Sequence, residues 1–462
     1  MKIAELARDK LGVIGSTMMG IAGTAPAFSI EVTMSTLILA MGIKAPASIL
    51  YCGIIMIGIV LAFINLNKVM PSAGTSYTWV SNIWGKNIGF ITGWSLLSAV
   101  CIFMVSATLP ISNATLLLLY PSMVNNVNAI AFLSVVWLSF VSLIVIKGIK
   151  VSSWLQSLIT ILEMIVLFFI LIFGFLKFYK MPVQSFDWGM LSFADLNTSI
   201  FVSGSLIALF FYWGWDVILN LSEETKNKKQ TPATAALLAI TSLILIFVAF
   251  TFISIMGLTT EEISSYNTNI LFALTEKIFG ASYGYIAVVV VLLSTLGTIE
   301  TGMLQFTRTL FAKSRDGALH SAYSKLHNDW QTPWVASVTI WFIGILLVFL
   351  STYIKSVNNI LYISIGAIGV QISFYLGMTA LACAYYYRHS KVINIDSFKS
   401  LIKEILYRIS HVYYPLFSGV FLIYIGIESL ISFDNITRLI GIGGIATGLI
   451  PILFKFLKNK IA

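Results

Sequence analysis

Among the carboxylic acids inside long apolar stretches of this 462-residue chain are Glu31, Glu163, Asp216 and Glu300. No lysine or arginine lies clearly in the middle of such a stretch, and Arg308 stands near the end of one. A charge at the centre of a bilayer costs at least about 2.5–3.5 kcal/mol, so an acid there usually has a function. We expect these four groups to exchange protons near neutral pH or to pair with an arriving cation, and we predict proton-coupling or gating roles for them.

The first acid follows a segment, GSTMMGIAGTAPAFSIEV, whose composition works against a continuous helix. Gly20, Gly23 and Pro26 fall at mid-membrane depth, where proline removes a backbone donor and glycine tolerates non-helical angles. This combination predicts an unwound stretch at residues 20–26. A simple proline kink or a close glycine-mediated helix contact would give the same pattern. The predicted substrate contacts are Gly20, Ile21, Ala22, Gly23, Thr24 and Ala25.

A second interruption is predicted in ALFFYWGWDVILNLSEETKN, where Gly214 is followed closely by Asp216. Aromatic residues around a glycine could simply fill core space, but a carboxylate two residues later favours a functional site. Aromatic rings there could stack on a substrate cation. The predicted substrate contacts are Phe210, Phe211, Trp213 and Trp215.

Interrupted helices would offer their free backbone groups to a zwitterion. Unwound backbone at membrane depth survives only where protein or a water-filled cavity satisfies it. Amide N–H groups at a half-helix N-terminus, here near Ala25 to Phe28, could receive a carboxylate. Free carbonyls at the opposite half-helix end could take an ammonium group. An amino acid carries both charges and therefore fits paired broken helices.

The segments that must position these residues are strongly apolar. Hydrophobic residues make up 58% of the chain and charged residues 10%, whereas a soluble domain has about 25% charged residues. We predict an all-α membrane protein of about twelve transmembrane helices, because a crossing needs about 20 apolar residues. The predicted spans are 12–41, 47–66, 87–118, 127–146, 153–178, 197–221, 234–257, 279–311, 335–354, 358–387, 412–431 and 437–457.

The two interruptions fall in the first and sixth spans. That placement is expected of a 5+5 inverted-repeat core with discontinuous helices 1 and 6, followed here by two extra C-terminal helices. The repeat rests on the positions of the breaks alone. The predicted divisions are a cytosolic N-terminus at 1–11, a ten-helix transporter core at 12–387, a cytosolic connector at 388–411, and two additional transmembrane helices with a cytosolic tail at 412–462.

Lysine and arginine residues predict the orientation of the chain. Of the 28 such residues, 22 fall on the side of the N-terminus, and the positive-inside rule then places both termini in the cytoplasm of a multi-pass cell-membrane protein. The net charge of +9 is thus explained by orientation and predicts no nucleic acid partner. We expect the basic connector to lie at the membrane surface and the first residues to be a lead-in, not a removed signal peptide.

Several segments resemble the amino acid–polyamine–organocation (APC) transporter superfamily. GIAGTAPAFSI is similar to the substrate-binding break of that family, and FFYWGWDVILNLSEETKNKKQTP to its sixth span and the E-E-T-x-N-P turn. GTIETGMLQFTRTLFAKSRDGALH resembles its eighth span, KVMPSAGTSYTWV the segment after span two, and GFITGWSLL the start of span three. The match covers about residues 10–390, and Lys228 departs from it because the family has proline there.

The resemblance implies an amino acid permease that alternates access around a site in spans one, three, six, eight and ten, with coupling to protons, sodium or exchange. It implies that Glu163 stands where some relatives carry a membrane-embedded lysine, so we predict proton coupling there; a neutral, hydrogen-bonded Glu163 is the alternative. It implies a gate or proton-linked acid at Asp216. Glu300 replaces a small polar residue. Neighbouring hydroxyls could hold sodium or satisfy Glu300; they belong to Ser294, Thr295, Thr298 and Thr301.

The substrate class stays open between two readings. Four acids without a basic counterpart suggest a cationic amino acid or polyamine, whereas a neutral amino acid would leave protons to neutralise the acids. The expected partners are this substrate, a proton or sodium ion, and the lipid bilayer. We predict no cofactor, metal or enzymatic reaction, since HExxH and GxxxxGK[ST] patterns are lacking and the three cysteines form no metal spacing. A channel would need a selectivity filter.

Overall fold

The computed structural model describes residues 5–124, 126–193, 197–266, 269–353, 357–390 and 398–461. Within these ranges the regular elements are helices, and the β-type pairing found there is one isolated bridge between Leu11 and Thr225. The predicted all-α class is confirmed. Ten stretches are long and apolar enough to cross a membrane, and one of them, Val13–Val69, contains three helices. The number of twelve spans stays a prediction.

Most predicted spans correspond to one long helix each. Proline stands in the first turn of several of these helices, where its missing N–H has no intrahelical partner to lose. The long helices are α3 (Ala45–Val69), α5 (Lys86–Leu119), α6 (Val127–Ile146), α7 (Ile149–Phe178), α10 (Thr231–Gly257), α13 (Gly284–Arg315), α14 (Trp334–Ser351), α15 (Val357–Tyr387) and α17 (Tyr414–Ser432).

The first and sixth spans are both interrupted. α1 (Val13–Thr24) ends at Ala25, which has a left-handed φ of 46°, and α2 (Pro26–Met41) begins at the next residue. The predicted unwound stretch at residues 20–26 is therefore wrong in extent: Gly20 to Thr24 keep helical geometry as the last turn of α1, and the break is confined to Ala25. α8 (Thr198–Phe211) is separated from the short α9 (Val217–Asn220) by residues that include Gly214, with a φ of 107°. Proline suits the first turn of a helix, as at Pro26, and glycine suits a positive φ, as at Gly214.

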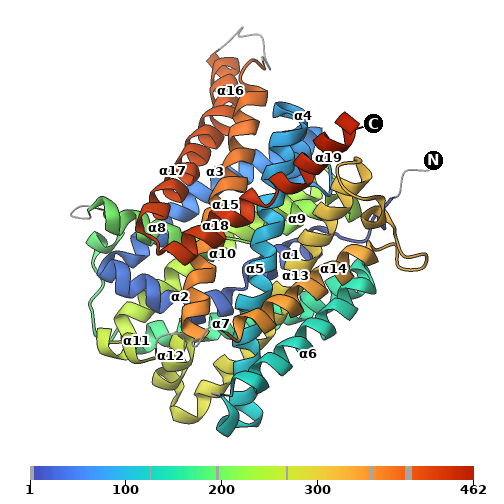
Figure 1. Cartoon of the computed structure of the whole chain (residues 1–462). Coiled ribbons are helices and arrows are strands. Elements are labelled where there is room, and N and C mark those ends of the chain that lie inside the picture. Colours follow the sequence, from blue (N-terminus) through green and yellow to red (C-terminus); the bar gives the residue numbers. More distant parts are fainter. Residues whose placement is uncertain are drawn as a thin grey trace.

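Two short helices at opposite ends of the bundle fit the inverted repeat, which stays a prediction. α4 (Thr75–Trp84) precedes α5 and α12 (Ile270–Phe279) precedes α13; each has 10 residues and each ends at a glycine, with φ 99° at Gly85 and 111° at Gly280. The sequences there, WGKNIGF and FGASYGY, share this glycine and a second one four residues later. Figure 1 shows α4 at the upper end of the molecule and α12 at the lower end.

Burial differs sharply between helices. The buried share of the apolar window is 72% in both Val13–Val69 and Ala281–Arg315 and 78% in Asn359–Tyr387, but only 28% in α7 and 33% in α14. Spans one, two, eight and ten therefore form the interior, and α7 and α14 lie at the periphery.

Part of the predicted connector is helical. α16 (Phe398–Arg408) continues through a π-helical turn at Ile409–Tyr413 directly into α17. Figure 1 shows it rising above the bundle as an extension of α17. The placement of the connector at the membrane surface stays a prediction. Residues 391–397 of the connector lie outside the described residues. α18 (Asn435–Ala446) and α19 (Leu449–Ile461) divide the last predicted span.

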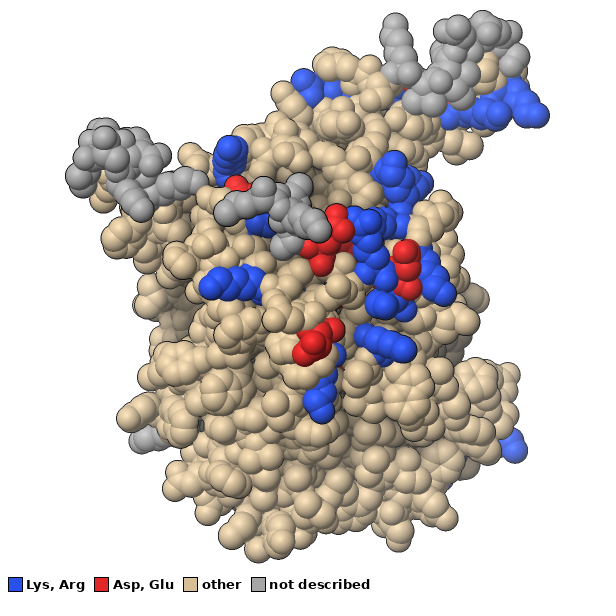
Figure 2. All heavy atoms as spheres, turned by 90° about the vertical axis from the view of Figure 1, so that its right-hand side faces the viewer, with Lys and Arg blue, Asp and Glu red and all other residues tan. Residues whose placement is uncertain are grey.

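Charged side chains gather toward one end of the molecule. Figure 2 shows most of the lysine, arginine, aspartate and glutamate residues of the visible face in its upper half. The helix α19 also ends in the upper half of Figure 1. We refer to the end of the bundle at which α1 begins as the N-terminal side.

Candidate substrate site at the interrupted helices

The two interruptions touch each other through their main chains. A Cβ atom added to Gly23 would lie 2.2 Å from the carbonyl oxygen of Gly214, and one added to Gly214 would lie 2.2 Å from that of Gly23. Only glycine at both positions allows this approach. The breaks thus meet in the interior of the bundle, as a site shared by both repeats requires.

The start of α2 is bound by a carboxylate of the protein itself. The Ala27 N–H donates to Oε1 of Glu163 at 2.9 Å, and Ser294 Oγ donates to the same oxygen at 2.6 Å. The Phe28 N–H donates to Ser294 Oγ at 3.3 Å. A helix N-terminus favours an anion, so Glu163 of α7 holds the position predicted for a substrate carboxylate.

The end of α1 is also satisfied by a side chain. Thr298 Oγ1 on α13 donates to the Gly23 carbonyl at 2.8 Å, and the Ala25 N–H donates to the carbonyls of Ile21 and Ala22 at 3.1 Å each. In this conformation the predicted backbone contacts are engaged within the protein. A substrate that uses them must displace Glu163 and Thr298.

Around the second break, aromatic and acidic groups form a chain of hydrogen bonds. Trp213 Nε1 donates to the Tyr375 hydroxyl, which donates to Oδ2 of Asp216, both at 2.9 Å. Asp216 Oδ1 has no hydrogen-bond partner among the described residues, although Gln305 of α13 lies nearby. The sequence analysis missed Tyr375 and Gln305. The feature that indicated them was a polar group, a hydroxyl or an amide, inside an apolar span.

An aromatic cluster covers the meeting point of the breaks. The Trp213 ring lies 5.2 Å from that of Phe103 on α5 and 6.5 Å from that of Phe210, and Phe103 lies 6.3 Å from Phe28. These residues come from spans one, three and six. The structure therefore brings Phe210 and Trp213 together with Phe28 and Phe103, and substrate contact at these rings stays a prediction.

Other predicted contacts point away from this cluster. Phe211 packs on Phe247 of α10 at 5.1 Å, and Trp215 packs on Phe63 of α3 at 5.4 Å. Gly20 faces α9, because a Cβ there would lie 2.3 Å from a methyl carbon of Ile218. These three residues pack the interrupted helices against α10, α3 and α9. Their direct contact with a substrate stays a prediction.

Glu300 is satisfied by a different hydroxyl from those expected. Ser152 of α7 donates to Oε1 of Glu300 in a short hydrogen bond. Thr295 and Thr301 bond instead to backbone carbonyls of their own helix, while Ser294 and Thr298 serve Glu163 and Gly23. The hydroxyls near Glu300 thus have separate partners.

Glu31 binds the N-terminus of α12. Its Oε2 accepts the Leu271 N–H at 2.6 Å and the Phe272 N–H at 3.4 Å. Glu223, which follows the second break, accepts the Ala73 N–H just before α4 at 2.8 Å. Each carboxylate thus reaches from beyond one break to a short helix of the other half of the chain, and the gating role of Glu31 stays a prediction.

Ion pairs fasten the N-terminal side. Arg308 forms two bonds to the carboxylate of Glu224, at 2.9 and 3.0 Å, and both side chains are fully buried. Arg315 bonds to Glu223 with two distances of 2.8 Å. Burial works to raise the pKa of Glu223, but the hydrogen bonds and charge of Arg315, with the Ala73 N–H, lower that pKa below its ordinary value of 4.5.

The backbone near Leu11 pairs with this ion-pair region. The N–H groups of Lys10 and Leu11 donate to the Glu224 carbonyl at 2.8 and 3.2 Å, and the Lys226 N–H donates to the Leu11 carbonyl at 2.8 Å. The segment before α1 therefore closes over the end of α9. The N-terminal side is held shut by main-chain and ionic contacts together.

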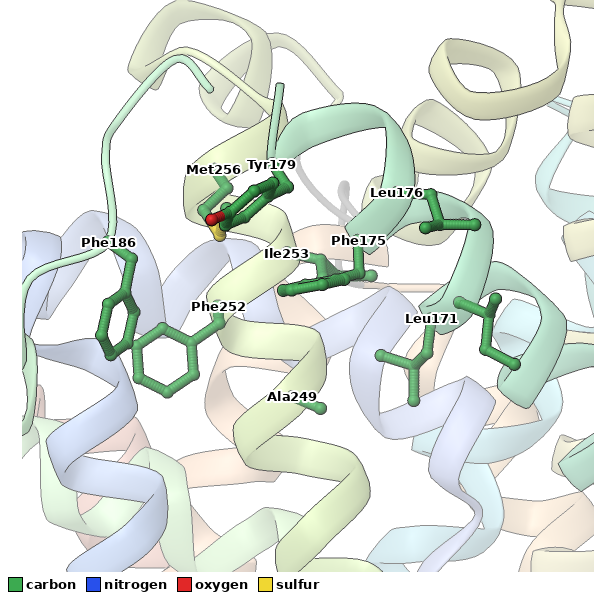
Figure 3. Close-up of a pocket in the computed structure, with 10 residues that line it drawn as sticks. Leu171, Phe175, Leu176, Tyr179, Phe186, Ala249, Phe252, Ile253 and Met256 are labelled. Carbon is green, nitrogen blue, oxygen red and sulfur yellow. The ribbon is translucent and has the colours of Figure 1, made fainter. Parts of the chain in front are cut away.

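Two cavities lie beside the core helices. Figure 3 shows one of about 640 Å³ between α7 and α10, whose lining includes Leu171, Phe175 and Phe252. Its apolar side chains suit hydrocarbon better than a zwitterion. A second, of about 510 Å³, borders α2, α8, α15 and α17 and exposes hydroxyls such as Thr33 and Ser203. It adjoins the two half-helices that lie away from the N-terminal side.

Comparisons with known proteins agree with this geometry. The family model described as "Amino acid permease" matches residues 11–446. The serine/threonine exchanger SteT of Bacillus subtilis is 27% identical over 289 residues, which cover 60% of this chain and 61% of the exchanger.

Two mammalian relatives show similar, weaker matches. The large neutral amino acids transporter small subunit 2 of Oryctolagus cuniculus is 23% identical over 328 residues, which cover 69% of this chain and 58% of that protein. The Asc-type amino acid transporter 1 of Homo sapiens is 22% identical over 282 residues, covering 59% and 52%. The aligned part thus spans between about half and three-fifths of the length of these relatives.

Proposed function

Because this chain belongs to the amino acid permease family, we propose that it is a secondary transporter that carries amino acids by alternating access around the paired breaks. The observation that carries this proposal is the main-chain contact of Gly23 with Gly214. Discontinuous helices that meet at mid-membrane are where such carriers bind their substrates. The relatives are named for transport or exchange of amino acids, which supports the same function.

The substrate class has two candidates, one from the names of the relatives and one from the acids of the core. Glu163 and Asp216 lie at the breaks and Glu300 lies further along α13, and each is held by neutral donors. We propose a neutral amino acid as first candidate, since the relatives are named for serine, threonine and large neutral amino acids. A cationic amino acid is the second candidate, favoured by these three acids. Competition of unlabelled serine, leucine, lysine and putrescine against labelled serine uptake separates the two.

Coupling to protons follows from the position of Glu163. The Ala27 N–H at the start of α2 serves Glu163 Oε1, and the same donor suits a substrate carboxylate. An ionised Glu163 and a substrate carboxylate would compete for this positive helix end. A proton on Glu163 removes its charge and weakens its hold on α2, so proton and substrate bind together. This arrangement makes proton symport the proposed mode.

The test uses purified protein in liposomes with labelled serine. Wild-type protein should accumulate serine when a pH gradient is imposed, and Glu163→Gln should lose this drive while exchanging serine for serine at equal pH. Glu428→Gln, a partly buried carboxyl on α17 outside the core, is the matched control. Equal gradient-driven uptake by Glu163→Gln would reject proton coupling at this residue. Wild-type uptake that needs internal amino acid and ignores pH would instead indicate exchange, and a sodium requirement would indicate sodium coupling.

Orientation and location are proposed on charge. Basic residues concentrate on the side of the N-terminus, and charges gather in one half of the face in Figure 2. We place both termini in the cytoplasm and the protein in the cell membrane. Protease or label accessibility of a tag at either end in intact cells checks this placement, and a tag reached from outside would reverse it.

A further inference from the structure

The buried face of α7 changes character at Glu163. Between its first turn and Glu163 the buried residues are mostly polar: Ser152, Ser153, Gln156, Ile159, Thr160 and Glu163. Beyond it they are Leu167, Ile170, Gly174 and Phe178. The rest of α7 is largely exposed and apolar. Polarity is thus confined to the half that runs from Glu163 toward the N-terminal side.

α13 meets this polar half at three successive levels. Ser294 bonds to Glu163 at 2.6 Å. Gly297 leaves room for Gln156, since a Cβ there would lie 2.4 Å from its Nε2. One turn further, Glu300 accepts the Ser152 hydroxyl. The two helices therefore run antiparallel, with a carboxyl at each end of their polar contact.

Several atoms between the two carboxyls lack partners. Oε2 of Glu163 and Oε1 of Gln156 make no hydrogen bond with described residues, although both side chains are only 1% exposed. Gln156 Nε2 donates to Thr160 Oγ1 at 2.9 Å. An unpartnered buried polar atom costs about 1–3 kcal/mol, so a purely structural network would have satisfied these atoms.

Other charged groups on the helices packed against α7 and α13 bond to other partners, as Asp216 does with Tyr375, or lie toward helix ends. The described residues of α1, α6, α10 and α14 include no charged side chain. Bonded groups are Glu31 with α12, Lys277 with Glu262, Lys313 with the Phe90 carbonyl, Arg308 with Glu224 and Arg315 with Glu223. Lys86 begins α5, Lys150 begins α7, Lys177 ends α7 and Glu276 lies on α12. Glu163 and Glu300 are thus the carboxyls of this interface.

We propose that the α7–α13 polar track, made of Ser152, Gln156, Thr160, Glu163, Ser294 and Glu300, carries the coupled proton between the substrate site and the N-terminal side. Glu300 is its second proton acceptor. The proton leaves Glu163, which returns to a carboxylate, passes along hydroxyls and admitted water to the Glu300 carboxylate, and is then released to the aqueous phase. The inference rests on the proposed proton coupling at Glu163.

The one-sided polarity of α7 gives the track its direction. Because the face beyond Glu163 is apolar, a proton cannot follow α7 from the far side. It must reach Glu163 through the substrate site, where it arrives with the substrate. Substrate and proton then share the entry and separate at Glu163, the substrate leaving between the breaks and the proton along the track.

The experiment compares wild type, Glu300→Gln and Gln156→Leu in liposomes with labelled serine. Both variants keep the size of the side chain but remove a proton acceptor or a polar link. We expect serine-for-serine exchange at equal pH to stay within about twofold of wild type, and pH-driven accumulation to fall at least about tenfold. Ser254→Ala on α10, which removes a buried hydroxyl bonded within its own helix, is the control and should retain both activities.

The outcomes distinguish failure of the polar track from failure of the proposed proton coupling at Glu163. If wild-type protein shows no pH-driven uptake, proton coupling itself is rejected. If pH-driven uptake persists in both variants, only the α7–α13 polar track is rejected. If Glu300→Gln also loses exchange, the polar track is judged on Gln156→Leu, because that variant leaves the carboxyls of Glu163 and Glu300 in place. Infrared difference spectra between acid and neutral pH give a second readout: the protonated-carboxyl band of wild type should lose one component in Glu300→Gln, and an unchanged band would contradict the assignment.

Discussion

Gly23 and Gly214 are the individual residues on which the meeting of the two breaks depends. Alanine at Gly23 would place a Cβ 2.2 Å from the Gly214 carbonyl oxygen, and such overpacking costs about 1–3 kcal/mol. Alanine at Gly214 should cost more, because its φ of 107° adds backbone strain of about 1–3 kcal/mol. We expect both variants to lower the unfolding temperature in detergent and to slow transport, with Gly214→Ala the more severe.

A glycine elsewhere in the chain provides the control for these two variants. Nothing lies within 4 Å of a Cβ added to Gly443 in α18. Gly443→Ala should leave transport unchanged and should raise stability by up to about 1 kcal/mol, since alanine favours helix more than glycine does. Normal stability and transport in Gly23→Ala would show that the two main chains do not need their close approach.

Residue types could be read from the sequence, but their partners could not. Pro26 and Gly214 predicted the breaks because their backbone preferences act locally, whereas Gly23 stays helical and is needed for its contact with Gly214. The contact of Glu163 with Ala27 joins positions 136 residues apart, and Tyr375 reaches Asp216 from 159 residues away. Such pairings depend on how whole helices pack, which one sequence does not specify.

The helix α12 depends on Glu31 for its N-terminal cap. Glu31→Ala would leave the Leu271 and Phe272 N–H groups without their acceptor, at a cost of about 1–3 kcal/mol. We expect faster hydrogen–deuterium exchange over residues 269–279. Glu31→Gln should have a smaller effect, because its amide oxygen still accepts a bond but lacks the charge that favours a helix N-terminus.

The exposed Glu261 on the neighbouring α11 (Thr260–Tyr266) supplies a matched control. Glu261→Gln should leave the exchange of α12 unchanged. Equal exchange in Glu31→Ala and wild type would mean that α12 holds its place without this carboxylate, and the gating role of Glu31 would then be lost.

Short helices escaped prediction where long ones did not. α4 and α12 have 10 residues each, close to the length at which helical periodicity can no longer be recognised. Their shared glycine spacing in WGKNIGF and FGASYGY was a visible signal. Its meaning depends on knowing that both segments are helices that stop at a left-handed glycine.

For the molecule as a whole, closure of the N-terminal side should depend on pH. Burial works to raise the pKa of Glu223, but Arg315 and the Ala73 N–H lower it below 4.5. A depressed carboxyl pKa stabilises the fold above the ordinary value, and this contribution is lost as the pH falls through the folded-state pKa. The unfolding temperature of wild type should therefore exceed that of Glu223→Gln at neutral pH, and the difference should vanish in acid.

The expected size of this effect is roughly 1 kcal/mol, because the ion pair is partly exposed. Asp187→Asn, an exposed carboxyl in the loop after α7, corrects for general effects of charge. A difference between wild type and Glu223→Gln that stays constant from neutral pH into acid would contradict the assigned role of the ion pair.

The main-chain contact at Gly23 and Gly214 also bears on leakage. A solute can pass through the middle of the protein only if these two main-chain segments separate, and the free energy of separating them must come from binding the solute. An amino acid can supply it through the groups that it contacts on either side, whereas a bare ion makes too few contacts to do so. Many copies would then sit in one bilayer without letting ions leak across it.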